Sequence, residues 1–272
     1  MKLVVASIED VAGKNIAQKI IELYQLQKTD QTYHEFPIYE KIIEGTEIKL
    51  VTLKTESIQA QYITNDFAPE LIVFVSKHSS QSGIPTLSVH TPGNLTSQAE
   101  KGGLPKQVSV APASAMKEAL KEMAQQIKEK QLSYAVSYEC THHGPSLNVP
   151  VMFAELGSSP TQWQDAEAAE AVAHATVKAV TTQITYPTVV GVGGPHYNDK
   201  FSKISLTMPT AFGHMIPKYA IAQVDAPMIK QCAERTVERV ETIMLDWKGI
   251  KGDDKQNLLE AIGQTGLRTE RI

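Results

Sequence analysis

The chain alternates short apolar runs rich in β-branched residues with longer segments whose apolar residues recur every three or four positions. The first pair is LVVASI, residues 3–8, and VAGKNIAQKIIELYQL, with Asp10 between them as a candidate N-cap. Strand-like and helix-like segments of such lengths, repeated along a chain, are typical of a mostly parallel sheet with helices on both faces. We therefore predict an α/β fold in which residues 1–272 form a single domain.

The remaining segments extend this pattern along the chain. Strands are predicted at residues 48–53, 71–76, 134–139, 149–156 and 188–194. Helices are predicted at residues 114–130, 165–182 and 254–262, together with one long helix from Ala226 through about residue 247. Ser114 is the expected N-cap of the first of these helices, and the helix at 254–262 is expected to close the fold.

Composition and charge exclude several classes of protein. With 42% hydrophobic and 21% charged residues the chain has the usual globular composition, and no apolar stretch is long enough for a signal peptide or a bilayer span. Cys140 and Cys232 are too few and too far apart for a disulfide framework or a Cys-only zinc site. A net charge of −4 argues against nonspecific coating of nucleic acid. We expect a cytoplasmic protein with no membrane or DNA partner.

Local contact with phosphate remains open at one stretch. Lys200, Lys203 and Lys218 lie close in sequence to a segment rich in His and Gly, where they could form a phosphate-contacting rim. Scattered lysines are more often solvated surface, so both interpretations stay open.

Six of the eight histidines follow a strand-like run or lie in a loop rich in Gly or Pro. They are His78, His90, His142, His143, His196 and His214. Loops that follow parallel strands converge on one edge of a sheet, where ligand sites of such folds are found. We therefore predict that these imidazoles meet at a single rim.

Two glutamates flank the adjacent histidines in YECTHHGPSLNVPVMFAEL: Glu139 before them and Glu155 after them. Imidazole and carboxylate ligands suit Zn²⁺, which lowers the pKa of a bound water to about 7, while a nearby carboxylate serves as general base. No HExxH pattern is present, so the spacing alone is weak evidence for a metal. On an extended backbone the rings of His142 and His143 diverge, so both reach one centre only if the chain bends at Gly144-Pro145.

Two other motifs allow different chemistry. SKHSSQSGIP places serines around His78, but no GxSxG elbow supports a Ser-His nucleophile. GVGGPHYND follows a strand with glycines that could cradle a phosphate, although it has neither the P-loop Lys-Ser/Thr nor the dinucleotide spacing, so a tight turn is the simpler interpretation.

Several long motifs occur in a fixed order: SKHSSQSGIPTLSVHTPGN, ECTHHGPSLNVPVMFAELGSS with TQW, GVGGPHY and GHMIPKYA. In this order they resemble the archaeal and plant type of D-aminoacyl-tRNA deacylase, over roughly Leu71 to Ala222. The resemblance implies hydrolysis of the ester that joins a D-amino acid to the 3′ end of tRNA, zinc as cofactor, and a phosphorylase/hydrolase-like three-layer α/β/α fold akin to bacterial peptidyl-tRNA hydrolase. Members of this family are also linked to clearing aldehyde-modified D-aminoacyl-tRNA. The family often has Glu-Ala-Thr where this chain has Glu139-Cys140-Thr141.

The resemblance sharpens the expected chemistry without assigning each residue, and the site that we predict draws on residues from these motifs. The expected metal ligands come from the set His78, His142, His143, Glu155, His196 and His214. The expected catalytic residues are Glu139, His142, His143 and Glu155, with Glu139 or Glu155 as general base. The expected substrate contacts are Ser79, Ser80, His90, Gly193, Gly194 and Lys200, with the amides of Gly193-Gly194 or of Ser79-Ser80 stabilising the oxyanion. The expected partner is the acceptor end of D-aminoacyl-tRNA, bound by a monomer or weak homodimer.

Two other function classes compete with this assignment. A zinc peptidase or amidase, or a general esterase, on the same fold would cleave substrates that contain no RNA. A noncatalytic module that binds tRNA or nucleotide would show affinity without turnover, but it would have little reason to gather carboxylates with histidines.

Overall fold

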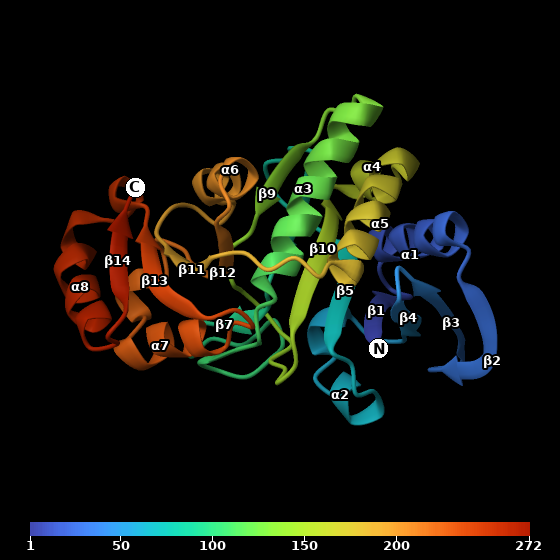
Figure 1. Ribbon diagram of the computed structural model, residues 1–272, viewed down its shortest axis with the longest axis horizontal. Coiled ribbons are helices and arrows are strands. Elements are labelled where there is room, and N and C mark those ends of the chain that lie inside the picture. The colour runs from blue at the N-terminus through green and yellow to red at the C-terminus, as the bar shows by residue number, and fades with distance from the viewer.

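Two β-sheets form the framework of the protein, and the computed structural model describes every residue from 1 to 272 (Figure 1). The larger sheet has the strand order β2-β3-β4-β1-β5-β10-β6-β9, and the smaller has the order β12-β11-β13-β14. In Figure 1 the smaller sheet and the C-terminus lie at one end of the molecule and β2 lies at the other. A short pair, β7 with β8, completes the strands.

The elements have the following bounds. The strands of the larger sheet are β1 (Lys2–Ser7), β2 (Gln27–Tyr33), β3 (Phe36–Ile43), β4 (Thr46–Leu53), β5 (Leu71–Lys77), β6 (Thr86–His90), β9 (Ala135–Tyr138) and β10 (Val151–Gly157). The other strands are β7 (Gly93–Asn94), β8 (Gln107–Val108), β11 (Thr188–Val192), β12 (Ala211–Ile216), β13 (Val240–Leu245) and β14 (Arg268–Arg271). The helices are α1 (Val11–Tyr24), α2 (Ile63–Asp66), α3 (Ala113–Lys130), α4 (Pro160–Trp163), α5 (Ala166–Thr181), α6 (Asp199–Thr207), α7 (Ala226–Glu234) and α8 (Lys255–Gly263). Single 3₁₀ turns are η1 (Ser57–Gln59), η2 (Ile221–Gln223), η3 (Trp247–Gly249) and η4 (Gly252–Asp254).

The predicted α/β class and the large, mostly parallel sheet are confirmed. Strand β1 pairs in parallel with β4 and β5, β5 with β10, and β6 with β9, and all pairings in the smaller sheet are parallel. The larger sheet also contains antiparallel pairs, because β6 runs against β10 and β2-β3-β4 form a meander. Asp10 caps α1 as predicted, since its Oδ1 accepts a hydrogen bond from the Gly13 amide at 2.8 Å.

The two faces of the larger sheet are covered unequally. Alternate residues such as Val4 and Val73 belong to a buried cluster with the apolar faces of α1, α3 and α5, which pack on one another beside the sheet (Figure 1). On the other face, Phe74 and Phe153 pack with Ile63 of α2 and with Leu147, which lies in the loop between β9 and β10. Long helices therefore cover one face, while short elements leave space beside the other.

Three predictions about individual elements are wrong. The helix from Ala226 ends at Glu234, and residues 240–245 form β13, the strand that lies between β11 and β14. Strand β14, and not α8, closes the fold. Ser114 lies inside α3, where the Glu238 carboxylate accepts hydrogen bonds from the first amides of the helix. The hairpin of β2 and β3 had no counterpart among the predicted strands.

None of the helices combines the length and apolar composition needed to span a membrane. The single-domain organisation, the monomeric or weakly dimeric state and the cytoplasmic location stay predictions.

Candidate active site

Side chains two residues apart on three neighbouring strands build one wall of the site. These pairs are Ser76 and His78 at the end of β5, Ser88 and His90 on β6, and Phe153 and Glu155 on β10. The strand register places Glu155 between Ser76 and Ser88, and Phe153 opposite His90. All six side chains therefore point to the face of the sheet that the long helices leave free.

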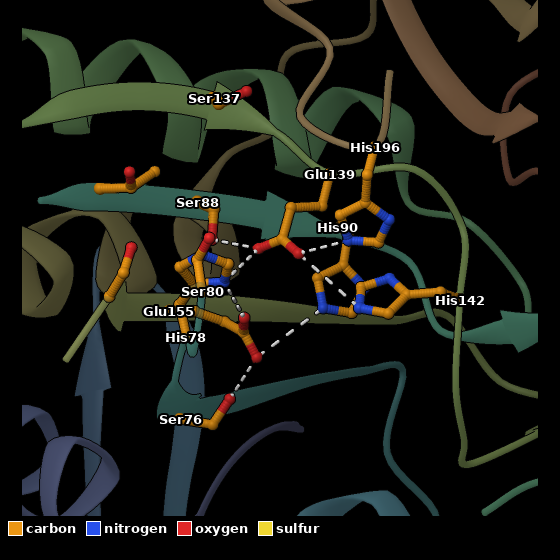
Figure 2. A network of polar contacts seen from close by, with 12 residues as sticks. Ser76, His78, Ser80, Ser88, His90, Ser137, Glu139, His142, Glu155 and His196 are labelled. Carbon is orange, nitrogen blue, oxygen red and sulfur yellow. Dashed lines mark hydrogen bonds and ion pairs between the residues drawn. The ribbon is translucent and has the colours of Figure 1, made fainter. Parts of the chain in front are cut away.

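Glu139, which directly follows β9, lies at the centre of the polar cluster (Figure 2). Its Oε1 accepts a hydrogen bond from Ser88 Oγ at 2.6 Å and lies 3.0 Å from His78 Nδ1. Its Oε2 lies 3.0 Å from His196 Nε2 and 3.7 Å from His142 Nε2. One buried carboxylate thus contacts imidazoles from three separate segments of the chain.

Glu155 is the second buried carboxylate of the cluster. Ser76 Oγ donates a hydrogen bond to its Oε1 at 2.7 Å, and His90 Nε2 lies 3.7 Å from the same oxygen. Its Oε2 lies 3.6 Å from His78 Nδ1, beyond good hydrogen-bond distance. His78 therefore lies between the two carboxylates and connects them (Figure 2).

The adjacent histidines both turn toward this cluster because the backbone bends at the second of them. His143 has a φ of 41°, in the left-handed region, so its ring is not forced to the side opposite that of His142. The two ring centroids lie 4.2 Å apart, and both rings pack against His90. The bend required by the sequence is thus present, and it begins at His143, one residue before Gly144.

Hydrogen bonds from the Nδ1 atoms fix the tautomers of His142 and His143. His142 Nδ1 donates to the Cys140 carbonyl at 2.8 Å, and His143 Nδ1 donates to the Gly144 carbonyl at 2.7 Å. Each neutral ring therefore carries its lone pair on Nε2, the atom that can bind a metal ion.

The protonation states of the cluster follow from burial and from its charges. Burial, together with the neighbouring His143 and His90, lowers the pKa of His142 well below its ordinary value, and burial lowers the pKa of His143 to about 4. Burial opposes ionisation of the two glutamates, but hydrogen bonds from His196 and His78 hold the pKa of Glu139 well below its usual range. Burial also opposes ionisation of Glu155, but the nearby rings of His78 and His90 bring its pKa to about 2. Burial opposes protonation of His78, but Glu139 and Glu155 raise its pKa to about 10, and Glu155 also raises the pKa of His90 despite its burial. At neutral pH the site therefore combines ionised carboxylates and neutral His142 and His143 with a protonated His78.

The arrangement of donors fits a metal ion. Three overlapping groups each hold three donor atoms within 4.8 Å of one another. They are His78, Glu139 and Glu155; Glu139, His142 and His196; and His90, His142 and His143. Three buried ring nitrogens in the cluster, His78 Nε2 and both nitrogens of His90, have no hydrogen-bond partner within the protein. Buried polar atoms are rarely left unpaired, so these nitrogens indicate a bound species.

A cavity of about 350 Å³ opens beside the cluster. Its lining includes most of the cluster together with Phe153, Ser79, Tyr197, Lys77 and Lys101. This volume is suited to a small ligand such as an aminoacyl group.

The structure brings most of the predicted site residues together. Those that line the cavity are His78, Ser79, Glu139, His142, His143, Glu155 and His196. His90 lies directly behind them, against His142 and His143. The Ser80 hydroxyl contacts Ser82, and its amide donates to the Ser158 carbonyl.

His214 does not join the cluster, which corrects its prediction as a metal ligand. It lies inside β12 and not in a loop after it. Its Nδ1 contacts Thr141 Oγ1 at 3.0 Å, and its Nε2 lies 3.1 Å from the carbonyls of Ser109 and Arg235. Both ring nitrogens are therefore engaged within the protein.

The glycine turn and Lys200 also have other roles than those predicted. The Gly193 amide donates to the Ile216 carbonyl at 2.9 Å and the Gly194 amide contacts the Gly249 carbonyl, so neither is free to stabilise an oxyanion. Lys200 pairs with Asp246 and does not line the cavity.

The site also contains residues that were not predicted, among them Ser76, Ser88 and Tyr219. Each serine precedes a predicted histidine by two positions, so the period of a strand could have revealed it. Tyr219 OH lies 2.9 Å from His196 Nδ1, a contact between separate loops for which the sequence carries no signal.

His214 is expected to stabilise the fold. Replacing it by Ala leaves the Thr141 hydroxyl and two buried carbonyls without their partner, so we expect the free energy of unfolding to fall by about 2 kcal/mol. For a chain of this length that corresponds to a melting temperature lower by roughly 4–8 °C. Thermal unfolding monitored by circular dichroism measures the change, and an unaltered melting temperature would contradict the structural role.

Comparison with known proteins agrees with the motifs of the sequence. Residues 65–270 match the family model described as D-aminoacyl-tRNA deacylase. The chain is 35% identical to the D-aminoacyl-tRNA deacylase of Pyrococcus furiosus over 274 residues, with 98% of both chains covered. It is 32% identical to that of Methanosarcina mazei over 271 residues, covering 97% of this chain and 90% of the relative.

A solved structure shares the fold of the whole chain. The crystal structure of a conserved protein of unknown function superimposes with a TM-score of 0.88 at 31% identity, covering all of this chain and 95% of the other. The family match spans most of the chain and includes every residue of the Glu139-centred cluster. The chain therefore belongs to the D-aminoacyl-tRNA deacylase family.

Proposed function

We propose that this protein hydrolyses the ester bond between a D-amino acid and the 3′ end of tRNA, at the cavity beside Glu139 and with zinc as cofactor. Membership of the family supports the reaction and the substrate. The position of the active site is inferred from the buried Glu139 carboxylate. This carboxylate contacts three imidazoles at the wall of a cavity suited to an aminoacyl group.

Zinc is the metal that best fits these donors. Imidazole nitrogens and carboxylate oxygens in groups of three match the protein ligands of catalytic zinc sites. Glu139, His142 and His196 would hold the ion, with His78 and Glu155 as the neighbouring donor group. When bound, zinc lowers the pKa of its water to about 7 and polarises a carbonyl oxygen.

Glu155 is the better candidate for the general base. Glu139 belongs to two of the donor groups, and its oxygens are shared among Ser88 and three histidines. Glu155 is held in place through Oε1 by Ser76, while its Oε2 makes only a long contact with His78 and is left to accept a proton from the attacking water.

The other residues of the cavity position the ester. The Nδ1 atom of His78 lies next to both carboxylates, and this holds the ring at the wall of the cavity. Ser79 offers the loop amide that remains available to the oxyanion, since the Gly193-Gly194 amides are engaged. A cavity that holds the amino group in one position would reject the L-enantiomer by steric clash, because the two enantiomers direct their side chains differently.

Matched substrates test the proposal. Purified protein incubated with D-Tyr-tRNA and L-Tyr-tRNA should deacylate the D-ester selectively. Equal cleavage of both would favour a general esterase, and cleavage of peptides would favour a peptidase or amidase. Binding of tRNA without release of tyrosine would identify a noncatalytic module.

Tyr219 is expected to position His196. Its hydroxyl contacts Nδ1 and so orients the ring toward Glu139. Partners of this kind typically contribute 10–100-fold to metal affinity or activity, so Tyr219→Phe should lower kcat by about tenfold and weaken zinc binding in parallel. Tyr186→Phe, which removes a hydroxyl bonded to Glu118, is the matched control and should leave both quantities unchanged. Unaltered kcat and zinc affinity in Tyr219→Phe would show that this contact has no such role.

A further inference from the structure

Basic side chains lie at the carboxyl edge of the smaller sheet, at or after the ends of its four strands. These cations are Lys200 after β11, Lys218 after β12, Lys248, Lys251 and Lys255 after β13, and Arg271 at the end of β14. Because all pairings in this sheet are parallel, the four strand ends meet at the same edge. A chain with a net charge of −4 thus concentrates positive charge at one place.

Backbone hydrogen bonds show that these segments are in contact. The Lys218 amide donates to the Gly194 carbonyl at 2.9 Å, and the Gly194 amide contacts the carbonyl of Gly249, the residue after Lys248. The amide of Trp247 contacts the carbonyl of Ile272, the neighbour of Arg271, at 3.3 Å. The segments that carry these cations therefore lie side by side, and together they are called the cationic edge.

Most of this positive charge is available to a ligand. Lys218, Lys248 and Lys251 are exposed and form no ion pair with a carboxylate. Of the acids nearby, Asp246 is paired with Lys200, while Asp253 and Asp254 lie at the N-terminus of α8, whose dipole they complement.

An aromatic residue supports the edge. The Arg271 guanidinium lies 3.9 Å and Lys255 Nζ lies 4.5 Å from the centre of the Trp247 ring. Such cation–π contacts limit the positions of both side chains.

The edge leads directly to the candidate active site. His196 follows Gly194 by two residues, so the chain between them spans at most about 7 Å. Tyr219, the residue after Lys218, contacts His196 through its hydroxyl. A polyanion whose end lies in the cavity can therefore reach these lysines.

We propose that the cationic edge, with Lys218 and Lys248 as its central contacts, binds the phosphate backbone of the tRNA acceptor arm while the aminoacyl ester lies in the cavity. The inference rests on the proposed function for the identity of the polyanion. It assigns a docking surface outside the Glu139-centred cluster. Lysines of this kind position a nucleic acid by charge and add no sequence specificity.

Binding of uncharged tRNA tests the surface without relying on turnover. The variant Lys218→Ala/Lys248→Ala is compared with Lys28→Ala/Lys128→Ala, which removes the same charge from exposed lysines on β2 and α3; β2 lies at the opposite end of the molecule (Figure 1). We expect the Kd of the first variant to rise about tenfold and the slope of log Kd against log salt concentration to fall by about 1.4, as for two lost phosphate contacts. The control should match the wild type. An unchanged Kd in the first variant, or equal weakening in both, would overturn the proposal.

Kinetics on two ester substrates distinguish a failure of the docking proposal from a failure of the proposed reaction. With D-Tyr-tRNA the first variant should show a raised KM and an unchanged kcat, whereas D-tyrosyl-adenosine, an ester without phosphates, should be cleaved as by the wild type. Equal loss on both substrates would place the lysines in the cavity and overturn the docking role. If the wild type cleaves neither ester, the proposed reaction is incorrect. The Kd values for uncharged tRNA still decide whether the cationic edge binds tRNA.

Discussion

Replacing Glu139 by Gln should lower kcat/KM for D-aminoacyl-tRNA by about 10³-fold, the scale expected when a central carboxylate of a hydrolytic metal site is lost. The substitution keeps the shape of the side chain but removes its negative charge. It also puts an amide NH₂ in place of one carboxylate oxygen. This NH₂ group then lies next to either His78 and Ser88 or His142 and His196. The cluster then loses the one anion that its three imidazoles share.

A matched variant separates this effect from a general effect of buried carboxylates. Glu118 is also buried, bonds to Lys121 and Tyr186, and does not line the cavity. Glu118→Gln should therefore lower the melting temperature without reducing kcat/KM. Steady-state kinetics and thermal unfolding of both variants provide the measurement. Activity of Glu139→Gln within twofold of the wild type would exclude Glu139 from the reaction.

The second large effect is expected for His142. It belongs to two of the three donor groups, and its Nδ1–H bond to the Cys140 carbonyl presents Nε2 to the cluster. His142→Ala should reduce turnover by about 10³-fold and reduce the zinc retained by the purified protein. His143→Ala should also reduce turnover, since this residue belongs to the third group.

His174 supplies the control for the histidine variants. It lies in α5, where its Nδ1 is 2.7 Å from the Tyr24 hydroxyl, and it does not line the cavity. His174→Ala should retain wild-type turnover and zinc content. Kinetics and elemental analysis measure both quantities, and full activity in both His142→Ala and His143→Ala would defeat the assignment of the histidine pair.

Elements with strong local patterns were predictable from the sequence. The cap at Asp10 and the apolar periodicity that follows it specify α1 without reference to the rest of the chain. Residues 240–245 show why other elements were not predictable. They continue a helical pattern that begins at Ala226, and only their place between β11 and β14 makes them a strand.

The clustering of histidines at one site was predictable from the sequence, but the strand geometry that produces it was predictable only in part. His78 and His196 follow parallel strands, as the loop rule requires. His90 lies on β6, which runs against β10, and it reaches the cluster because the register pairs it with Phe153. His214 was misplaced because the same rule was applied to a residue inside β12. Sequence position alone does not reveal register or the end of a strand.

Removal and return of the metal tests most directly whether this cluster hydrolyses the D-aminoacyl ester with a bound cation. The wild-type protein is stripped with a chelator, assayed with D-Tyr-tRNA, and assayed again after zinc is added. We predict loss of deacylation on stripping and its recovery with zinc, with no recovery in the Glu139→Gln variant. Full activity in protein shown by elemental analysis to be free of metal would contradict the account.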